Sequence, residues 1–288
     1  MLVVERGDER MIDINRFALN RITSPALGLE EFFRMTAELG LSKVELRNDL
    51  PGGRITDGMP PAKAAELAEK CGVRIITVNA QQKFNLGALK DRVSRELEEL
   101  LDTTQALRCP AIVLCPNNDT KDTRSPETRL AETVAALTAF GPSFMRRGIL
   151  GYVEPLGFAE CSLQSIVTAV TAITRSGFSC YRTVYDNFHH YLGPDTEKDI
   201  GATYDVSHTG LIHVSGVESS IAKEKYRDEH RVLVGPADRT FAREQIARHL
   251  RLGYTADISF EPFAPEVQKL PKAELMKALR SSMEYLSR

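Results

Sequence analysis

The sequence predicts a single-domain α/β fold, a closed (β/α)8 barrel, from three observations. One unit recurs along the chain: an amphipathic helix ends near a glycine, and a short apolar run follows at once. These runs are rich in β-branched residues and lack clean alternation, which is typical of strands buried on both faces of a parallel sheet. The length of 288 residues also suits one barrel of roughly 250 residues with extensions.

Eight apolar runs are expected to form the strands. They span residues 14–19, 44–46, 75–78, 111–115, 149–153, 181–185, 211–214 and 258–260. A glycine before a run can take the left-handed conformation that ends a helix and lets the chain enter a strand. Such glycines are Gly40, Gly72, Gly148, Gly177, Gly210 and Gly253. Before the fourth run, Cys109-Pro110 fills the same place.

Seven amphipathic helices are expected between these strands. They span residues 29–39, 60–70, 91–107, 127–147, 163–174, 241–252 and 272–286. Seven helices and eight strands favour a closed TIM barrel. An open doubly wound sheet is the alternative, and it is disfavoured because no glycine-rich phosphate loop follows the first strand.

The domain boundaries follow from composition along the chain. No linker rich in proline, glycine or serine divides it, so we expect residues 11–288 to form one domain. Residues 1–10 are too charged for a signal peptide. We expect them to be a disordered N-terminal extension.

Composition and charge exclude several classes of function. A hydrophobic share of 42% and a charged share of 26% are typical of soluble globular chains. The net charge of −2 gives no reason to expect a nucleic-acid partner. No stretch approaches the roughly 18 apolar residues that span a membrane. The five cysteines are odd in number and form no CxxC pair, which indicates reduced thiols in a cytoplasmic protein.

The last four strands end in residues that can bind a metal ion. Active sites of (β/α)8 barrels lie at the C-terminal ends of the strands. Strands five to eight end in Glu154, Asp186, His213 and Glu261. Three buried carboxylates that converge on one rim would repel each other without a cation between them. This oxygen-rich set predicts one divalent ion, Mn²⁺, Mg²⁺, Co²⁺ or Zn²⁺. The alternative is that each charge caps a helix or pairs with an arginine.

The earlier strands end in Asn20, in Glu45 with Arg47, in Asn79, and in Cys115 with Asn117. For Arg47 and Glu45 we favour a salt bridge beneath the site over a substrate contact. Asn79 is a candidate for binding substrate hydroxyls, and so is Asn117, although asparagine also ends strands for turn reasons alone. Cys115 is interpreted as a small buried residue and not as a nucleophile, since no basic partner is evident.

Several stretches carry a resemblance to a known family. The chain resembles the xylose-isomerase-like superfamily of TIM barrels, and within it the inosose (2-keto-myo-inositol) isomerases of inositol catabolism. The similar stretches are Val44-Glu45-Leu46-Arg47, Asn79-Ala80, Phe84-Asn85, Val153-Glu154-Pro155-Leu156-Gly157, Asp186-Asn187-Phe188-His189, Ile212-His213-Val214, His230-Arg231-Val232 and Ser259-Phe260-Glu261-Pro262-Phe263.

The resemblance implies roles for individual residues. It makes Glu154, Asp186, His213 and Glu261 the metal ligands, and Glu154 and Glu261 also the acid–base groups. It places His189 and Glu160 beside the ligands or the substrate, and Arg231 in a loop that faces the substrate in relatives. His189 is expected either to orient a hydroxyl and shuttle its proton or to hydrogen-bond a ligand carboxylate. Arg47 and Asn79 complete the expected substrate contacts.

The chain departs from its relatives at two places. Relatives show a Pro-Gly-x-Gly turn after the arginine, whereas this chain reads Val234-Gly235-Pro236-Ala237-Asp238. Epimerase relatives carry an arginine soon after the seventh-strand histidine, where Glu218 and Ser219 stand here. These departures concern the substrate. Endonuclease IV-like activity is disfavoured, because it needs further histidines for three zinc ions and a basic groove.

The expected function is a metal-dependent isomerase or epimerase of a small polyhydroxy ketone, with inosose as the favoured substrate. Proton transfer between adjacent carbons would pass through an enediolate that the metal stabilises. One alternative is a lyase on the same scaffold, either a dehydratase of a keto-cyclitol or a decarboxylase of a 3-oxo sugar acid. Another is a barrel that binds a metabolite without catalysis. The expected partner is a small polyol or ketose, and assembly into a homo-oligomer stays open.

Overall fold

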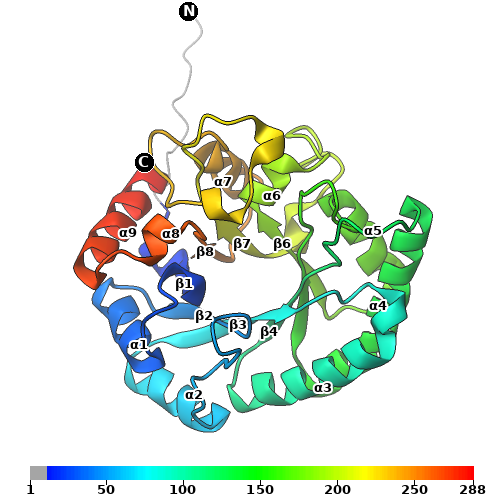
Figure 1. The fold of residues 1–288 in the computed structure, drawn as a ribbon, viewed down its shortest axis with the longest axis horizontal. Helices are drawn as coiled ribbons and strands as arrows, with labels where there is room; N and C mark the ends of the chain where they lie inside the picture. The colour runs from blue at the N-terminus through cyan, green and yellow to red at the C-terminus, as the bar shows by residue number, and fades with distance from the viewer. Residues whose placement is uncertain (1–11) are drawn as a thin grey trace, which may run out of the picture.

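The computed structural model describes residues 12–288, and the expectation for residues 1–10 lies outside this range. Eight parallel strands close into a barrel in chain order, from β1 to β8 (Figure 1). The helices surround the strands as an outer ring. The predicted α/β class and the closed (β/α)8 barrel are therefore confirmed. Among residues 12–288, no helix is long and apolar enough to cross a membrane.

Each strand pairs in parallel with both of its neighbours, and β1 closes the barrel against β8. The strands are β1 Phe17–Asn20, β2 Lys43–Arg47, β3 Arg74–Gln81, β4 Ala111–Leu114, β5 Leu150–Val153, β6 Tyr181–Asp186, β7 Thr209–Val214 and β8 Asp257–Phe260. The register pairs Asn20 with Glu45, Arg47 with Asn79, and Asp186 with His213. Because the strands are parallel, their C-terminal ends form one rim, which carries the polar side chains.

The helices match the predicted ones in position, and two further short helices occur. The α-helices are α1 Leu29–Glu38, α2 Pro61–Lys70, α3 Lys90–Ala106, α4 Pro126–Arg147, α5 Ile166–Ser176, α6 Asn187–Leu192, α7 Ala242–Arg251, α8 Pro265–Gln268 and α9 Lys272–Leu286. The prediction missed α6 and α8. Their six and four residues are too few to show a helical period.

The third strand continues to Gln81, beyond its predicted end at residue 78. Two predicted starts were also wrong, because side chains cap the chain there. The first strand begins at Phe17 and not at residue 14, since the Asp13 carboxylate accepts the N–H of Asn15 (2.9 Å) and starts a 3₁₀ turn. Helix α5 begins at Ile166 and not at residue 163. Ser165 caps it by accepting the N–H of Thr168 (3.0 Å).

The glycine prediction holds at five of the six positions. Gly148 (φ 66°) and Gly177 (φ 76°), for example, end α4 and α5 in the left-handed conformation. It was wrong for Gly210, which lies inside β7 in extended backbone. A Cβ atom there would lie 2.5 Å from Cε1 of Tyr152, so this glycine makes room for a ring inside the barrel.

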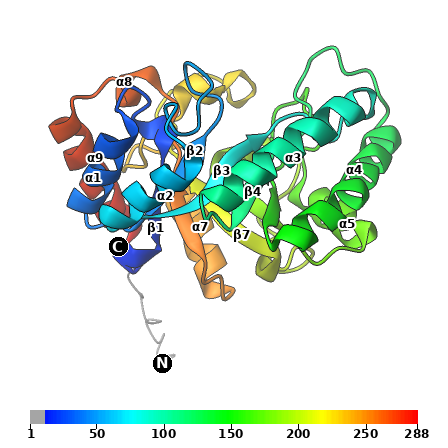
Figure 2. The same ribbon diagram turned by 90° about the horizontal axis from the view of Figure 1, so that it is seen from below.

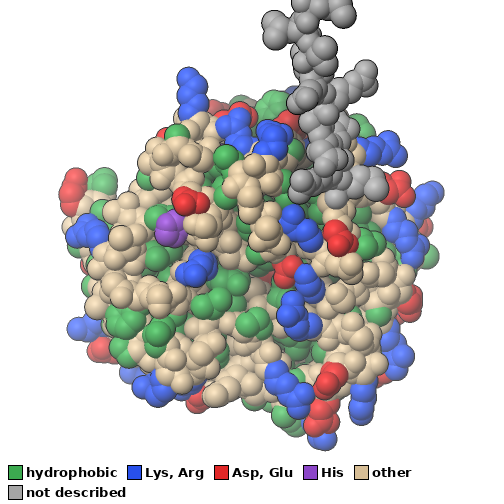
Figure 3. Space-filling view, turned by 180° about the vertical axis from the view of Figure 1, so that it is seen from behind, with side chains coloured by type: hydrophobic (Ala, Val, Ile, Leu, Met, Phe, Trp, Pro, Cys, Tyr) green, Lys and Arg blue, Asp and Glu red, His purple; other side chains and the backbone are tan. Residues whose placement is uncertain are grey.

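The barrel interior changes from apolar to polar toward the rim. Below the rim, Tyr152 packs on one small cluster of Ala18, Ile76 and Leu211 and on a second that contains Val113 and Val184. The main hydrophobic core lies between the strands and the ring of helices. Figure 2 shows these strands and helices from below. Seen from behind Figure 1, side chains of both charge signs are interspersed over the part of this face that residues 12–288 form (Figure 3).

Candidate functional site

Four sequence-predicted ligands meet at the rim, from four consecutive strands. One ligand atom each of Glu154, Asp186, His213 and Glu261 lies within 4.8 Å of the others, and all four side chains are buried. Asp186 and His213 belong to β6 and β7, while Glu154 and Glu261 directly follow β5 and β8. The N–H of Glu154 donates to Leu114 (3.1 Å) and that of Glu261 to Val214 (3.0 Å). The adjacent strands thus hold both glutamates in place.

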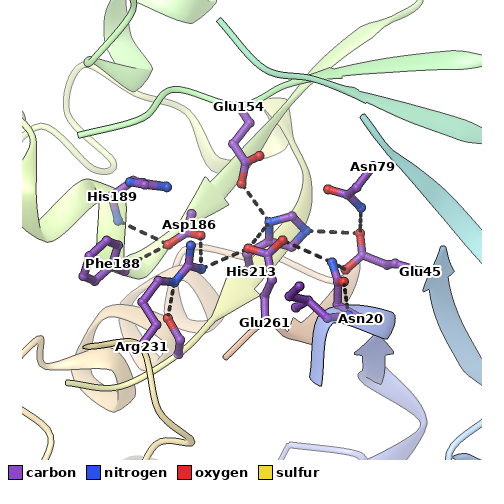
Figure 4. Close-up of polar contacts among 12 residues, drawn as sticks. Asn20, Glu45, Asn79, Glu154, Asp186, Phe188, His189, His213, Arg231 and Glu261 are labelled. Carbon is purple, nitrogen blue, oxygen red and sulfur yellow. Dashed lines mark hydrogen bonds and ion pairs between the residues drawn. The ribbon is translucent and has the colours of Figure 1, made fainter. Parts of the chain in front are cut away.

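His213 lies at the centre of the cluster (Figure 4). Its Nδ1 atom is 2.8 Å from Glu154 Oε1 and 3.2 Å from Glu261 Oε2. Its Nε2 atom is 3.1 Å from Glu45 Oε2. Burial opposes a charge on the ring, but Glu261, Glu45 and Glu154 outweigh it and hold the pKa of His213 well above its usual value.

Two buried arginines neutralise part of the negative charge. Arg231 donates from Nη2 to Asp186 Oδ2 (2.6 Å) and Glu261 Oε2 (2.9 Å). Arg47 donates to Glu261 Oε1 (2.6 Å) and, through two bonds of 2.8 and 2.7 Å, to Asp49. Burial alone would raise the pKa of Glu261, yet His213, Arg231 and Arg47 hold it well below its usual value. Glu261 is therefore ionised.

The predicted salt bridge between Arg47 and Glu45 was wrong. Glu45 instead accepts hydrogen bonds from Asn20, Asn79 and Thr77. Both side chains point into the barrel, but Glu45 lies two residues earlier on β2 and so one layer deeper. At that depth it meets the amides and the hydroxyl of β1 and β3, whereas Arg47 reaches the rim.

Asp186 combines two tasks at the start of α6. Its Oδ1 atom accepts the N–H groups of Phe188 (2.8 Å) and His189 (3.2 Å), which caps the helix. Its Oδ2 atom is bonded to Arg231. Burial raises the pKa of Asp186, and Arg231 acts to lower it. The cap explains why a six-residue helix begins directly at a strand end.

His189 projects from the first turn of α6 beside the cluster (Figure 4). Its ring lies edge-on to Phe158, with centroids 5.0 Å apart. Within residues 12–288 its Nδ1 atom has no hydrogen-bond partner, and only its backbone N–H contacts a ligand carboxylate. Burial and the nearby Arg231 lower the pKa of His189 to about 4, so the ring is neutral at pH 7. The alternative in which its ring hydrogen-bonds a ligand carboxylate is therefore not observed.

The remaining candidates fall into different environments. Asn79 is buried and donates to Glu45 Oε2 (2.9 Å), so its amide nitrogen is already engaged. Asn117 donates to Asp122 (2.9 Å). Glu160 lies partly exposed in the turn before Cys161, and it is not part of the ligand cluster.

Cys115 is buried beside the cluster, with its Sγ atom 3.5 Å from Glu154 Oε2. Burial raises the pKa of this thiol well above its usual value, and Glu154 raises it further. The side chain is therefore a neutral thiol, which agrees with its interpretation as a buried residue and not a nucleophile.

The buried charges of the site do not balance within the described residues. Four carboxylates, those of Glu45 and the three acidic predicted ligands, face the two guanidiniums of Arg47 and Arg231. A cation bound to His213 would replace the proton of the ring and leave it neutral, and two negative charges would then remain, which equals the charge of one divalent cation. Three carboxylate oxygens and one imidazole nitrogen are also a set that such cations accept. The residues present fit a divalent metal ion.

The comparisons with known proteins agree with this architecture. Residues 33–287 match the family model of the xylose isomerase-like TIM barrel. A comparison with curated protein sequences gave no match. Among solved structures, a xylose isomerase domain containing protein from Salmonella typhimurium LT2 is 36% identical. The match covers 96% of this chain and 98% of that one, with a TM-score of 0.89.

Two more distant structures share the fold. The IolI protein, whose crystal structure holds a zinc atom, is 20% identical over 94% of this chain and 98% of its own, with a TM-score of 0.84. The 3-keto-D-glucoside 4-epimerase YcjR from E. coli is 13% identical over 94% of this chain and 99% of its own, with a TM-score of 0.71. From the family match and the 36% identical structure, the chain belongs to the xylose isomerase-like TIM barrel family.

Proposed function

We propose that the protein is a divalent-metal-dependent isomerase or epimerase of a small, uncharged polyhydroxy ketone, with inosose as the favoured substrate. One observation carries the proposal: four ligand atoms from consecutive strands lie within 4.8 Å of one another in a buried rim. The neighbours support the class, because they include an epimerase of a keto sugar and a zinc-containing protein.

Glu154 is the better placed of the two glutamates to move a proton. Its Oε2 atom has only the weak Cys115 thiol as a donor within residues 12–288. Glu261 accepts from Arg47 on one oxygen and from Arg231 on the other. We assign to Glu154 the removal of the proton from the carbon beside the carbonyl, and to Glu261 the second acid–base position across the rim.

The other residues bind and orient the substrate in this proposal. When bound, a divalent ion in this ligand set polarises a carbonyl and the adjacent hydroxyl group. His189 is neutral, and its Nδ1 atom is free of partners in the described range, so it can orient a substrate hydroxyl or carry its proton. Glu160 and Asn79 stay candidates for further hydroxyl contacts.

The pairing of the arginines favours an uncharged substrate. A 3-oxo acid or a sugar phosphate needs a cation for its own charge. Of the two arginines beside the cluster, Arg47 already binds two carboxylates of the protein and Arg231 binds three. A decarboxylase of a 3-oxo acid is therefore less well supported than an enzyme of neutral keto-polyols.

The test is proton exchange in D₂O, followed by NMR. Purified protein loaded in turn with Mn²⁺, Mg²⁺, Co²⁺ or Zn²⁺ is incubated with inosose and a panel of neutral ketoses. We expect deuterium on the carbon beside the carbonyl and a new isomer with an unchanged number of carbons. Deuterium incorporation and isomer formation should both stop after a chelator removes the metal. Loss of water would show a dehydratase. Full exchange by the metal-free protein would contradict the proposal.

A further inference from the structure

Glu45 is a buried carboxylate that touches the cluster at one residue only, His213. It is the third residue of β2, and its side chain is wholly inaccessible to solvent. Asn20 from β1 donates to its Oε1 atom (3.2 Å), and Asn79 from β3 donates to its Oε2 atom (2.9 Å). The hydroxyl of Thr77 donates to the same Oε2 atom. Donors from both neighbouring strands thus hold the carboxylate in one orientation (Figure 4).

The held oxygen meets the far side of the His213 ring. Nε2 of His213 is 3.1 Å from Glu45 Oε2, while Nδ1 points at Glu154 and Glu261. A neutral imidazole has one nitrogen that donates and one that accepts. Carboxylates face both ring nitrogens, so in the metal-free site each nitrogen can donate a proton. A cation in the cluster would need the lone pair of Nδ1, and the one proton of the neutral ring would then lie on Nε2, which donates it to Glu45. The other nitrogen then has its lone pair directed into the cluster.

We propose that Glu45 is a positioning residue of the metal centre. It holds the proton of His213 on Nε2 and turns the ring, so that Nδ1 is the nitrogen offered to a divalent cation. The inference rests on the metal site of the proposed function. It also explains why a fourth carboxylate is buried below three others, although it supplies no ligand atom to the cluster. Carboxylates that orient a ligand histidine raise the affinity of metal sites by about 10 to 100-fold.

Zinc binding measures this role without reference to catalysis. In E45Q the side chain keeps its size but loses its charge, and its amide nitrogen faces the donors of Asn20, Asn79 or Thr77. We expect E45Q to bind Zn²⁺ about 10 to 100-fold more weakly than the parent protein in competition with a chromophoric chelator. The matched control is E31Q on the exposed face of α1, which removes one negative charge away from the site and leaves zinc affinity unchanged.

The spectroscopic test uses protein with ¹⁵N-labelled histidine, loaded with Zn²⁺. We expect His213 to show a proton on Nε2 and a metal-bound Nδ1, and E45Q to shift the Nε2 proton signal. A proton on Nδ1, or parent-like zinc affinity in E45Q, would overturn the proposal. If E45Q does not fold, T77V replaces it. T77V removes one donor that holds the carboxylate and must also weaken zinc binding.

The outcomes separate this inference from the proposed function. Weaker zinc binding by E45Q together with no turnover of any keto-polyol leaves the positioning role intact and rejects the isomerase. If the parent protein converts a keto-polyol and E45Q binds zinc as tightly as the parent does, the isomerase is supported and the positioning role of Glu45 is rejected. Unfolding of metal-free E45Q in urea provides the structural check, because a merely structural role lowers stability without altering zinc affinity in the folded protein.

Discussion

At the scale of the residue, the site is a balance of buried charges. Glu261 accepts hydrogen bonds from two guanidiniums, whereas the Oε2 atom of Glu154 has only the thiol of Cys115 as a donor in the described range. Two glutamates that look equivalent in the sequence therefore differ in how free they are to move a proton. The difference comes from Arg47 and Arg231, which lie on β2 and in the loop after β7.

Substitution of Glu154 by glutamine removes the proposed base and keeps the size of the side chain. We expect E154Q to exchange the substrate proton about 10² to 10⁴-fold more slowly, the usual contribution of a positioned acid–base group. The rate is measured by NMR in D₂O at saturating metal. The exposed Glu99 of α3 supplies the control variant, E99Q, with parent-like exchange. Unchanged exchange in metal-loaded E154Q would remove Glu154 from the mechanism.

At the scale of the element, single residues decide how strands and helices fit together. Asp186 ends β6 and caps α6 with the same side chain, which is why a very short helix can place His189 beside the cluster. Inside β7, Gly210 leaves room for the ring of Tyr152 from β5. The first contact joins a strand to the helix that follows it, and the second joins β5 to β7, which lie on either side of β6.

Replacement of Gly210 by alanine tests this packing. The added Cβ atom would lie 2.5 Å from a ring carbon of Tyr152, so the ring or the strand must move. We expect G210A to lower the free energy of unfolding by about 1 to 3 kcal/mol, as overpacked cores do. Urea unfolding measures it. The control is G28A, where a Cβ atom would meet no described atom within 4 Å. Equal stability of the two variants would refute the packing argument.

At the scale of the whole molecule, a buried neutral histidine packs the outer helix α7 against the barrel. His249 of α7 lies with its ring centroid 3.8 Å from that of Tyr185 in β6. Its Nδ1 atom is 3.0 Å from the carbonyl oxygen of Gln245, and its Nε2 atom has no partner within residues 12–288. Burial lowers the pKa of His249 to about 4. Protonation would place a second N–H in a buried position without an acceptor.

Stability should therefore fall as the solution becomes acidic. In the unfolded chain the pKa of a histidine is about 6.5, so between pH 6.5 and 4 the unfolded state binds the proton that the folded state refuses. The loss begins as pH drops below 6.5 and is complete below the folded value of about 4. The gap between the two pKa values corresponds to about 3 kcal/mol.

Urea unfolding at several pH values checks this dependence. Between pH 7 and pH 4, we expect the parent protein to lose about 3 kcal/mol more than H249Q does, since glutamine cannot be protonated. The control is H208Q, which replaces a partly exposed histidine at the end of a 3₁₀ turn. Parallel curves for the parent and H249Q would show that His249 does not contribute.

The sequence by itself determined the barrel, the order of its elements and the candidate ligands. The repeating unit of helix, glycine and apolar run reports local conformation and burial, which depend on residues near each other in the chain. The rule that active sites lie at the C-terminal ends of barrel strands then turns four strand ends into one site. For this reason Glu154, Asp186, His213 and Glu261 could be named before any coordinates.

Only the tertiary structure decided which partner each polar side chain has. Glu45 contacts His213 and does not form the salt bridge with Arg47 that the sequence predicted. Gly210 was expected to end a helix, but it lies in a strand and leaves room for the ring of Tyr152. These contacts join strands that are far apart in sequence, and they depend on the depth of each side chain in the barrel, to within a few ångströms. Sequence periodicity specifies the face on which a side chain lies, but neither its layer nor its neighbour, because both follow from the closure and stagger of the eight strands.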